Sequence, residues 1–320
     1  MSDHRPLVPI AAAELDRLLD ALMVEFVRLS ECLVGEGYRL ELGGIDAPGL
    51  HYNLSGTGRL IAGNGEPIEL QPHTLVVLPA KTLFRIEVPP RREPSGRWRT
   101  IDGRAQQFPP GAVRRYVAND GEAVIMLICG YFHASYGSAT DLFGALKSPI
   151  IEQFSEGDQV DESLRTALME LVAQEVGSGA MSAALLKQVI VALLRRSLRS
   201  MDLWVERFSL LSDPQIARAF AEMVAHPGAR HSVSSLARAA FLSRSAFEAR
   251  FNRVVGRSPM MVLRDLRMRQ AADQLTSTAM TVDEIARHAG YASPSSFVRA
   301  FRRAHGCDPT SFRRSHGGKV

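Results

Sequence analysis

The spacing of hydrophobic residues changes along the chain and divides it into regions. Within residues 11–29, apolar side chains recur at helical intervals between charged ones, at Leu15, Leu18, Leu19, Leu22, Phe26 and Val27. This spacing predicts one amphipathic helix. From about Tyr38 to His133, short β-rich pieces alternate with Gly, Pro and Asn turns, at 50–54, 59–62, 74–79, 83–88 and 124–132. Short strands at regular intervals are typical of a sandwich or small barrel, and Gly63-Asn64-Gly65 predicts a hairpin.

After Ser148-Pro149 the pattern becomes helical for the rest of the chain. Asp161–Val176 and Ser182–Ser200 are predicted helices, and the second has a broad apolar face. This face either packs on the adjacent barrel or forms a dimer interface. Ser212-Asp213-Pro214 is a typical helix start, with proline in the first helical position. We therefore expect a strand-rich domain at 1–148, linker or dimerisation helices at 149–208, and a helical domain at 209–320.

Charge is distributed unevenly between these regions. The chain has 38 Lys and Arg against 34 Asp and Glu, a net charge of +4. Residues 209–320 alone hold 17 basic and 8 acidic residues, or +9, which leaves −5 for the first 208 residues. A basic segment joined to an acidic body indicates a polyanionic partner for the C-terminal domain.

The basic segment contains an internal repeat. Leu236-Ala237-Arg238 recurs 49 residues later as Ile285-Ala286-Arg287. The residues Phe247, Phe251, Gly256 and Pro259 recur 50 residues later as Phe297, Phe301, Gly306 and Pro309. Each copy reads as a short helix, a tight turn and a longer helix. Two such copies in register predict a pair of helix-turn-helix motifs.

The elements of each copy fit this interpretation. Ala237 and Ala286 are small where two helices cross, Ser243 and Ser293 can cap the second helix of each motif, and Pro294 suits its first position. Between the copies, Pro259–Thr276 predicts a long helix that carries Arg264, Arg267 and Arg269. Its length of about 25 Å can place two recognition helices in successive major-groove segments of DNA.

These motifs resemble the AraC/XylS family of bacterial transcription regulators. The resemblance covers about residues 213–314 and rests on Ile285-Ala286-x3-Gly290-Tyr291-x2-Pro294-x2-Phe297-x3-Phe301-x4-Gly306-x2-Pro309. It implies that the exposed face of each recognition helix reads base edges. The implied base-reading residues are Arg244, Ser245, Glu248, Ala249, Ser295, Ser296 and Arg299, with Arg299 suited to guanine and Arg302 and Arg303 to phosphate. Phe241 departs from the family pattern, which has glycine in the first turn, and makes that turn's geometry an open question.

The same resemblance implies a cupin-like sensor domain, and so an α+β multidomain protein. Its expected architecture is an N-terminal cupin-like β-barrel with flanking helices and a C-terminal all-α double helix-turn-helix domain. Many cupins are metal enzymes, whose ligands include closely spaced histidines. His51, His73 and His133 are scattered, so we expect no metal, no cofactor and no catalysis. A metal-dependent cupin enzyme is the competing class.

One motif in the sensor region suggests an effector. Asn53-Leu-Ser55-Gly-Thr-Gly58 fits the Asn/Asp-x-Ser-x-x-Gly motif of PilZ-type cyclic-di-GMP receptors, and strand alternation places Asn53 and Ser55 on one face. The partner Arg-x3-Arg element is missing, but an arginine-rich loop is present at Arg91, Arg92, Arg97 and Arg99, followed by Arg104. Guanidinium groups suit a dianionic nucleotide. Cyclic-di-GMP is the hypothesis, and another small organic effector is the alternative.

The remaining features indicate location and partners. The cysteines Cys32, Cys129 and Cys307 form no disulfide framework or CxxC pair, which favours a reducing cytoplasm. We expect no secretory signal at the N-terminus and no membrane span, because apolar runs are far shorter than about 20 residues. The expected protein is a cytoplasmic transcription regulator, most simply an activator. Its expected partners are double-stranded DNA, a small effector, a second copy in a homodimer and RNA polymerase.

Overall fold

The computed structural model describes residues 12–90, 98–108, 114–136, 140–144, 146–173, 178–200, 210 and 212–316. Backbone contacts divide the chain into two compact units. The strand-rich unit combines Val24–Ala134 with Phe143–Arg207, and the helical unit combines Met1–Met23, Ser135–Leu142 and Phe208–Val320. No helix in the described ranges is long and apolar enough to span a membrane.

Two sheets form the strand-rich unit. The larger sheet has the order β12-β6-β3-β10-β1-β9, with β11 paired to β10, and the smaller sheet has the order β5-β4-β7-β2-β8. The strands of the larger sheet are β1 (Met23–Val34), β3 (Gly49–Ser55), β6 (Thr74–Leu78), β9 (Arg114–Ala118), β10 (Ile125–Tyr136), β11 (Thr140–Asp141) and β12 (Ile150–Gln153). Those of the smaller sheet are β2 (Tyr38–Gly43), β4 (Gly58–Ala62), β5 (Ile68–Leu70), β7 (Leu83–Glu87) and β8 (Arg99–Asp102). A short 3-10 helix, η1 (Gly103–Ala105), follows β8.

The core of this unit lies between the two sheets. It contains inward-facing residues of both, among them Cys32, Leu40, Leu60, Ile86 and Leu127. β3 pairs antiparallel with β6 and β10, whereas β1 pairs parallel with β9. The predicted hairpin is confirmed, because β4 and β5 are antiparallel and Gly65 N–H donates to the Ala62 carbonyl over 2.9 Å.

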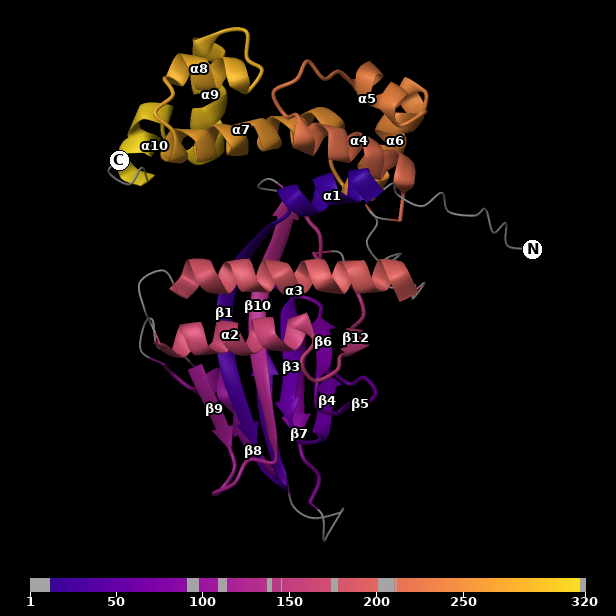
Figure 1. The fold of residues 1–320 in the computed structure, drawn as a ribbon, viewed down its shortest axis with the longest axis vertical. Helices are drawn as coiled ribbons and strands as arrows, with labels where there is room; N and C mark the ends of the chain where they lie inside the picture. The colour runs from indigo at the N-terminus through magenta and orange to yellow at the C-terminus, as the bar shows by residue number, and fades with distance from the viewer. Residues whose placement is uncertain are drawn as a thin grey trace, which may run out of the picture. The chain divides into compact units, whose positions relative to one another are not determined.

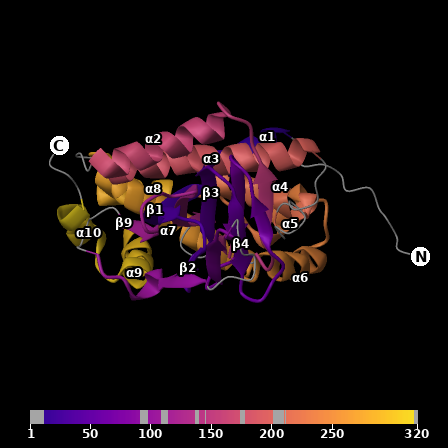
Figure 2. The ribbon, with the colours of Figure 1, turned by 90° about the horizontal axis from the view of Figure 1, so that it is seen from below.

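Two helices cover one face of the larger sheet, α2 (Gln159–Ala173) and α3 (Ser178–Ser200) (Figures 1 and 2). The apolar face predicted for the second of them is buried at Leu186, Val189, Ile190, Leu193 and Leu194. Leu186 and Leu164 lie beside Leu50 and Phe132 of the sheet. The apolar face of α3 therefore packs within its own unit.

The sequence-based prediction of one helix over 11–29 is wrong for residues 23–29. α1 (Ala12–Ala21) ends before Leu22, and β1 begins at Met23. β1 is flanked by β10 and β9 in the larger sheet. Pairing of β1 within the larger sheet overrides the local helical spacing of Phe26 and Val27.

The helical unit contains both predicted helix-turn-helix motifs (Figure 1). Its C-terminal helices are α4 (Pro214–Ala225), α5 (Val233–Ala239), α6 (Arg244–Val255), α7 (Pro259–Ser277), α8 (Val282–His288), α9 (Pro294–His305) and α10 (Pro309–His316). α5 and α6 form the first motif, α8 and α9 the second, and α7 connects them. α1 belongs to this unit and packs on α4.

Candidate DNA interface and effector cavity

The two helix-turn-helix motifs are built from the same local elements. Ser243 accepts from the Ala246 N–H over 3.3 Å, and Ser293 accepts from the Ser296 N–H over 3.3 Å. Each recognition helix ends at a left-handed glycine, Gly256 or Gly306. Caps of these two kinds provide hydrogen-bond partners for the backbone N–H and carbonyl groups that have none at the ends of a helix. The predicted caps Ser243 and Ser293 are therefore confirmed, as is Pro294 in the first helical position.

The aromatic repeat orients each recognition helix. Phe247 and Phe251 are fully buried in the first motif, as are Phe297 and Phe301 in the second. The opposite face of each helix carries the predicted base-reading residues. Arg244, Ser245, Ala249, Ser295, Arg299, Arg302 and Arg303 are exposed, and Glu248 and Ser296 are partly buried.

Two arginines of this set, Arg244 and Arg299, already have side-chain partners. Arg244 lies 3.8 Å from the Glu248 carboxylate one turn along α6. Arg299 donates to the Ser296 hydroxyl over 3.4 Å. Both contacts are weak and exposed, so either arginine can turn toward a base without a large loss of energy.

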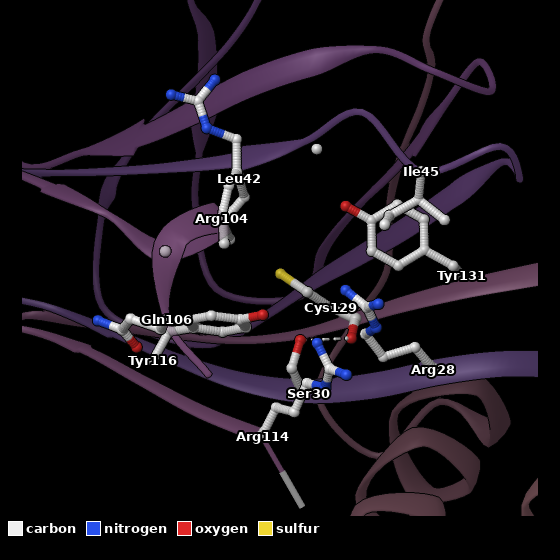
Figure 3. A pocket seen from close by; sticks show the side chains of 12 residues that line it. Arg28, Ser30, Leu42, Ile45, Arg104, Gln106, Arg114, Tyr116, Cys129 and Tyr131 are labelled. Atoms are coloured by element: carbon white, nitrogen blue, oxygen red, sulfur yellow. Dashed lines mark hydrogen bonds between the residues drawn. The ribbon is translucent and has the colours of Figure 1, made fainter. Parts of the chain in front are cut away.

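A cavity of about 240 Å³ opens inside the barrel of the strand-rich unit. It is lined by Arg28, Ser30, Leu42, Gly43, Ile45, Gly103, Arg104, Gln106, Arg114, Tyr116, Cys129 and Tyr131. Figure 3 shows the side chains of β1, β9 and β10 around this space, and β2, η1 and the residues beside them supply the rest of the lining. The cavity therefore combines cationic groups, hydroxyls and apolar surface.

Two arginines flank the hydroxyl of Ser30. Arg28 and Ser30 share one face of β1, because side chains alternate along a strand. Arg114 is the β9 neighbour of Ser30 in the parallel ladder. Both arginines are half-buried, and neither forms an ion pair in the part of the chain that the structure describes. The Arg114 guanidinium lies 5.5 Å from the centre of the Phe108 ring.

The third arginine of the cavity is already neutralised. Arg104 pairs with Asp102 and Glu41 over 2.8 Å each, and in Figure 3 its guanidinium points away from Ser30. A net positive charge in the cavity therefore comes from Arg28 and Arg114.

Neutral polar groups complete the cavity. The Ser30 hydroxyl donates to the Cys129 carbonyl over 3.0 Å. Burial raises the pKa of the Tyr131 hydroxyl and that of the Cys129 thiol. Both groups therefore stay protonated at neutral pH and can donate hydrogen bonds.

The residues predicted to bind a nucleotide lie elsewhere. Asn53 is buried and donates to the Gly56 carbonyl over 2.9 Å, Ser55 is exposed, and Gly58 packs beside Ile125. Arg99 donates to the Tyr38 hydroxyl and to Asp120. None of these four lines the cavity, whereas Arg104 does. Arg91, Arg92 and Arg97 lie outside the described residues.

Sequence reasoning missed Arg28, Ser30, Arg114 and the two tyrosines. Arg28 fell inside the predicted helix, so its alternation with Ser30 and Cys32 was not used. Arg114 and Tyr116 belong to a strand that was not predicted. The alternation Arg28-x-Ser30-x-Cys32 is the pattern that could have revealed this face.

The three histidines considered for metal binding are separate from one another. His51 is fully buried against Phe84, with ring centres 4.3 Å apart, and desolvation lowers its pKa to about 3. His73 contacts Asp161 over 3.2 Å. Among the described residues, no three His, Cys, Asp or Glu side chains gather in a way that could hold a metal ion.

Together, a paired helix-turn-helix unit and a barrel with an internal cavity define the class of ligand-binding, DNA-binding regulators. A helix-turn-helix domain model matches residues 236–315, and a cupin model matches residues 15–199. The chain belongs to the cupin-containing AraC-type transcription regulators. The predicted fold class is confirmed, as is the prediction that the protein is not an enzyme.

Proteins similar to this chain are named as transcription regulators, and two of them match it over most of its length. The RCS-specific HTH-type transcriptional activator RclR of Escherichia coli (strain K12) is 24% identical over 284 residues, covering 88% of this chain and 90% of that protein. The HTH-type transcriptional regulator MtrA of Neisseria gonorrhoeae is 23% identical over 318 residues, covering 95% and 99%. The solved DNA-binding domain of AdpA in complex with a target DNA is 33% identical, covers 32% of this chain and 92% of that chain, and gives a TM-score of 0.31.

Proposed function

We propose that this regulator binds DNA under the control of a small organic anion held in the barrel cavity. The observation that carries the proposal is the pair of half-buried guanidinium groups, Arg28 and Arg114, on either side of Ser30. Two half-buried cations that share one cavity, with no carboxylate partner among the described residues, are costly. An anionic ligand between them removes this cost and gains charge-assisted hydrogen bonds.

The size of the cavity limits the ligand. A dry cavity of about 150 Å³ holds a benzene ring, and pockets for drug-sized molecules span about 300–1,000 Å³. The volume here, about 240 Å³, lies between the two. A carboxylate with a body of about one ring fits, with its body against Leu42, Ile45 and Tyr116.

Benzoate and its neutral counterpart benzamide test this proposal by calorimetry on the full chain. We expect benzoate to bind and benzamide to bind at least about tenfold more weakly, because a charged hydrogen bond contributes about 1.5–3 kcal/mol. Arg28→Gln and Arg114→Gln should each lower benzoate affinity by a similar factor. Arg115→Gln is the matched control, because Arg115 follows Arg114 on β9 but pairs with Glu31. Equal affinity for both probes contradicts the assignment of charge.

Cyclic-di-GMP is the second candidate effector, carried by the Asn53-x-Ser55-x-x-Gly58 motif and the arginine-rich segment that includes Arg99. A molecule of this size would bind outside the barrel cavity, so its site is independent of Arg28 and Arg114. Calorimetric titration should detect binding that Ser55→Ala combined with Arg92→Ala abolishes. The absence of heat at tens of micromolar ligand excludes this candidate.

Base recognition is proposed to depend on Arg299 in the second motif. An arginine can donate two hydrogen bonds to the O6 and N7 atoms of guanine. Arg299→Ala should cost about 1–3 kcal/mol on the operator and relax selectivity at one base pair. Binding to an operator selected by the full chain from random DNA is compared with binding to unselected DNA. An equal loss on both would assign Arg299 to phosphate contact instead.

The effector is proposed to stabilise a homodimer that activates transcription with RNA polymerase. The activating role is supported by the similar protein RclR, which is named an activator.

Met169 on α2 and Met181 on α3 are 72% and 50% exposed. These side chains make the outer faces of the two helices candidates for the dimer contact. Light scattering with and without benzoate measures the assembly state, and transcription from a selected operator in a purified system measures the sign of regulation.

A further inference from the structure

The two helix-turn-helix motifs have separate cores joined by one helix. The second motif buries Met268, Ala271, Leu275 and Ile285 around Phe297 and Phe301. In the first motif, Phe251 packs on Phe247 and stacks on Phe220 of α4, with ring centres 5.4 and 6.2 Å apart. α7 contacts α4 and α6 at one motif and α8 and α9 at the other. Helices bend, so α7 alone leaves the relative rotation of the motifs poorly defined.

A second connection joins the motifs through the loop between α4 and α5. In this loop, Gly228 lies so close to the second motif's turn that an added Cβ would be 1.8 Å from the His288 carbonyl oxygen. An added Cβ on Gly290, in that turn, would be 2.6 Å from the Gly228 carbonyl oxygen. Backbones approach this closely only where side chains are missing. The entry loop of one motif therefore packs directly against the turn of the other.

Arg267 of α7 holds this contact in place. Its Nε–H donates to the Pro227 carbonyl and its Nη2–H donates to the Ala229 carbonyl, each over 2.8 Å. These two carbonyls flank Gly228. The same Nη2 atom lies 3.0 Å from the position of an added Cβ on Gly290, so the guanidinium also packs beneath the second turn.

The environment of Arg267 is unusual for an arginine on a DNA-binding helix. The side chain is half-buried, desolvation lowers its pKa, and it forms no ion pair with the acidic side chains that the structure describes. Burying a cation costs energy unless its hydrogen bonds are made. Both bonds go to the loop of the first motif from a helix that continues into the core of the second. The Arg267 guanidinium therefore connects the two motifs, and this role differs from that of an arginine that contacts a DNA phosphate.

We infer that Arg267, with Gly228 and Gly290, sets the distance and rotation between the two recognition helices, and so the spacing of the DNA segments that the regulator accepts. Arg267 is a positioning residue, since its side chain donates hydrogen bonds to two backbone carbonyls of the loop between α4 and α5. One added base pair moves a DNA segment by about 3.4 Å and turns it by about 34°. A rigidly connected pair of motifs cannot follow such a change without losing contacts.

The test uses the full chain and an operator selected by it from random DNA. Affinities are measured for this operator and for versions with one base pair inserted or deleted between the two contacted segments. We expect the wild type to bind the altered DNAs at least about tenfold more weakly, comparable to the loss of one base contact. Arg267→Met, which removes the donors but keeps an apolar stem, should reduce this difference to about threefold or less.

Arg264→Met is the matched control, because Arg264 lies about one turn earlier on α7 and is exposed. It should weaken binding by the same factor on every spacing and lower the salt dependence. Arg267→Lys keeps the cation, can reach one carbonyl at a time and should give an intermediate spacing preference. If Arg267→Met does not unfold cooperatively on heating, the spacing preference of Arg267→Lys is used to test the inference instead.

A parallel loss of affinity on all spacings, with the wild-type preference kept in the Arg267 variants, would overturn the inference. A failure of the recognition-helix assignment is detected separately. In that case Arg299→Ala leaves base selectivity intact, whatever the spacing preference of the Arg267 variants.

Discussion

Phe241 adopts a backbone conformation that is unfavourable for a residue with a bulky side chain. Its φ is +55°, in the left-handed region, as is that of Gly290 at the equivalent place of the second motif, with +75°. The two turns make the same hydrogen bond, from Phe241 N–H to the Arg238 carbonyl and from Gly290 N–H to the Arg287 carbonyl, each over 3.0 Å. The first turn therefore keeps the family geometry and accepts a cost of about 1–2 kcal/mol.

Phe241→Gly is expected to raise the free energy of unfolding of the helical unit by about 1 kcal/mol. Glycine relieves the strain, although it adds freedom to the unfolded chain and loses the contact of the ring with Arg218, 5.0 Å away. Urea unfolding measures the change. The opposite substitution in the second turn, Gly290→Ala, should destabilise the unit, because its Cβ would lie 2.6 Å from the Gly228 carbonyl. A lower stability of the Phe241→Gly variant would contradict this account.

His51 makes the stability of the strand-rich unit depend on pH. Desolvation lowers its pKa to about 3, and neither ring nitrogen has a hydrogen-bond partner among the described residues. The unfolded chain takes up a proton near pH 6.5, so it binds more protons than the folded state at any pH between about 3 and 6.5. Above about pH 6.5, His51 does not reduce the free energy of unfolding. Below that pH, the free energy of unfolding falls by up to about 1.4 kcal/mol per pH unit because of this residue.

His51→Leu should remove this dependence, since leucine does not titrate. Urea midpoints measured between pH 7 and pH 4 provide the comparison with the wild type. An unchanged slope in the variant would assign the acid sensitivity to other groups, such as Asp161.

The cavity residues show where sequence reasoning reaches its limit. Nothing between Asp20 and Glu31 interrupts the chain, because this stretch has no Gly, Pro or Asn. No local sequence feature therefore marks the change from helix to strand at Leu22, and the helix predicted over residues 11–29 includes Arg28 and ends just before Ser30. Arg114 becomes their neighbour through a parallel pairing between strands more than 80 residues apart in the sequence, which local patterns do not specify.

At the scale of elements, the helical motifs were predictable because their ends are marked. Asp213 caps α4 ahead of Pro214, and Ser293 caps α9 ahead of Pro294. The connecting helix was predicted at Pro259–Thr276 and spans Pro259–Ser277. Short strands such as β5, β8 and β9 have no comparable capping residues at their ends, and their pairing depends on strands that are distant in the sequence.

The partner of α1 is also a tertiary feature. Its apolar stripe predicted burial, but not against which element. It packs on α4, with Glu14 accepting from Arg218 over 2.5 Å and Arg17 lying 3.5 Å from Glu222. Leu18 is fully buried, so this helix is part of the core of the helical unit.

Leu18→Ala should therefore destabilise the helical unit by about 2–5 kcal/mol, the range for a buried leucine. Hydrogen exchange read by mass spectrometry should show faster exchange in α4 and unchanged exchange in the strands of the barrel. Val27→Ala is the control, since Val27 is 47% exposed on β1. Faster exchange in the barrel alone would place the contribution of α1 in the other unit.

At the scale of the whole molecule, the cavity and the DNA surface must be thermodynamically coupled if the effector regulates binding. Linkage requires that the factor by which an effector strengthens DNA binding equals the factor by which DNA strengthens effector binding. Calorimetric titration of benzoate into the free protein and into its operator complex should give this same factor, about 5–150-fold for typical coupling. Equal benzoate affinities in the two titrations would show binding without regulation.

The two units interleave along the chain, and this constrains how such a regulator can be recombined. β10 passes from the strand-rich unit to the helical unit between Ala134 and Ser135. Beyond that point, the Tyr136 ring packs on Phe220 of α4, with ring centres 5.2 Å apart. A gene fusion made at residue 208 would graft the seven C-terminal helices onto a foreign sensor without α1 or Tyr136. Such a chimera would lack the side chains of α1 and Tyr136 that pack on α4, so the foreign sensor would have to supply another apolar partner for that helix.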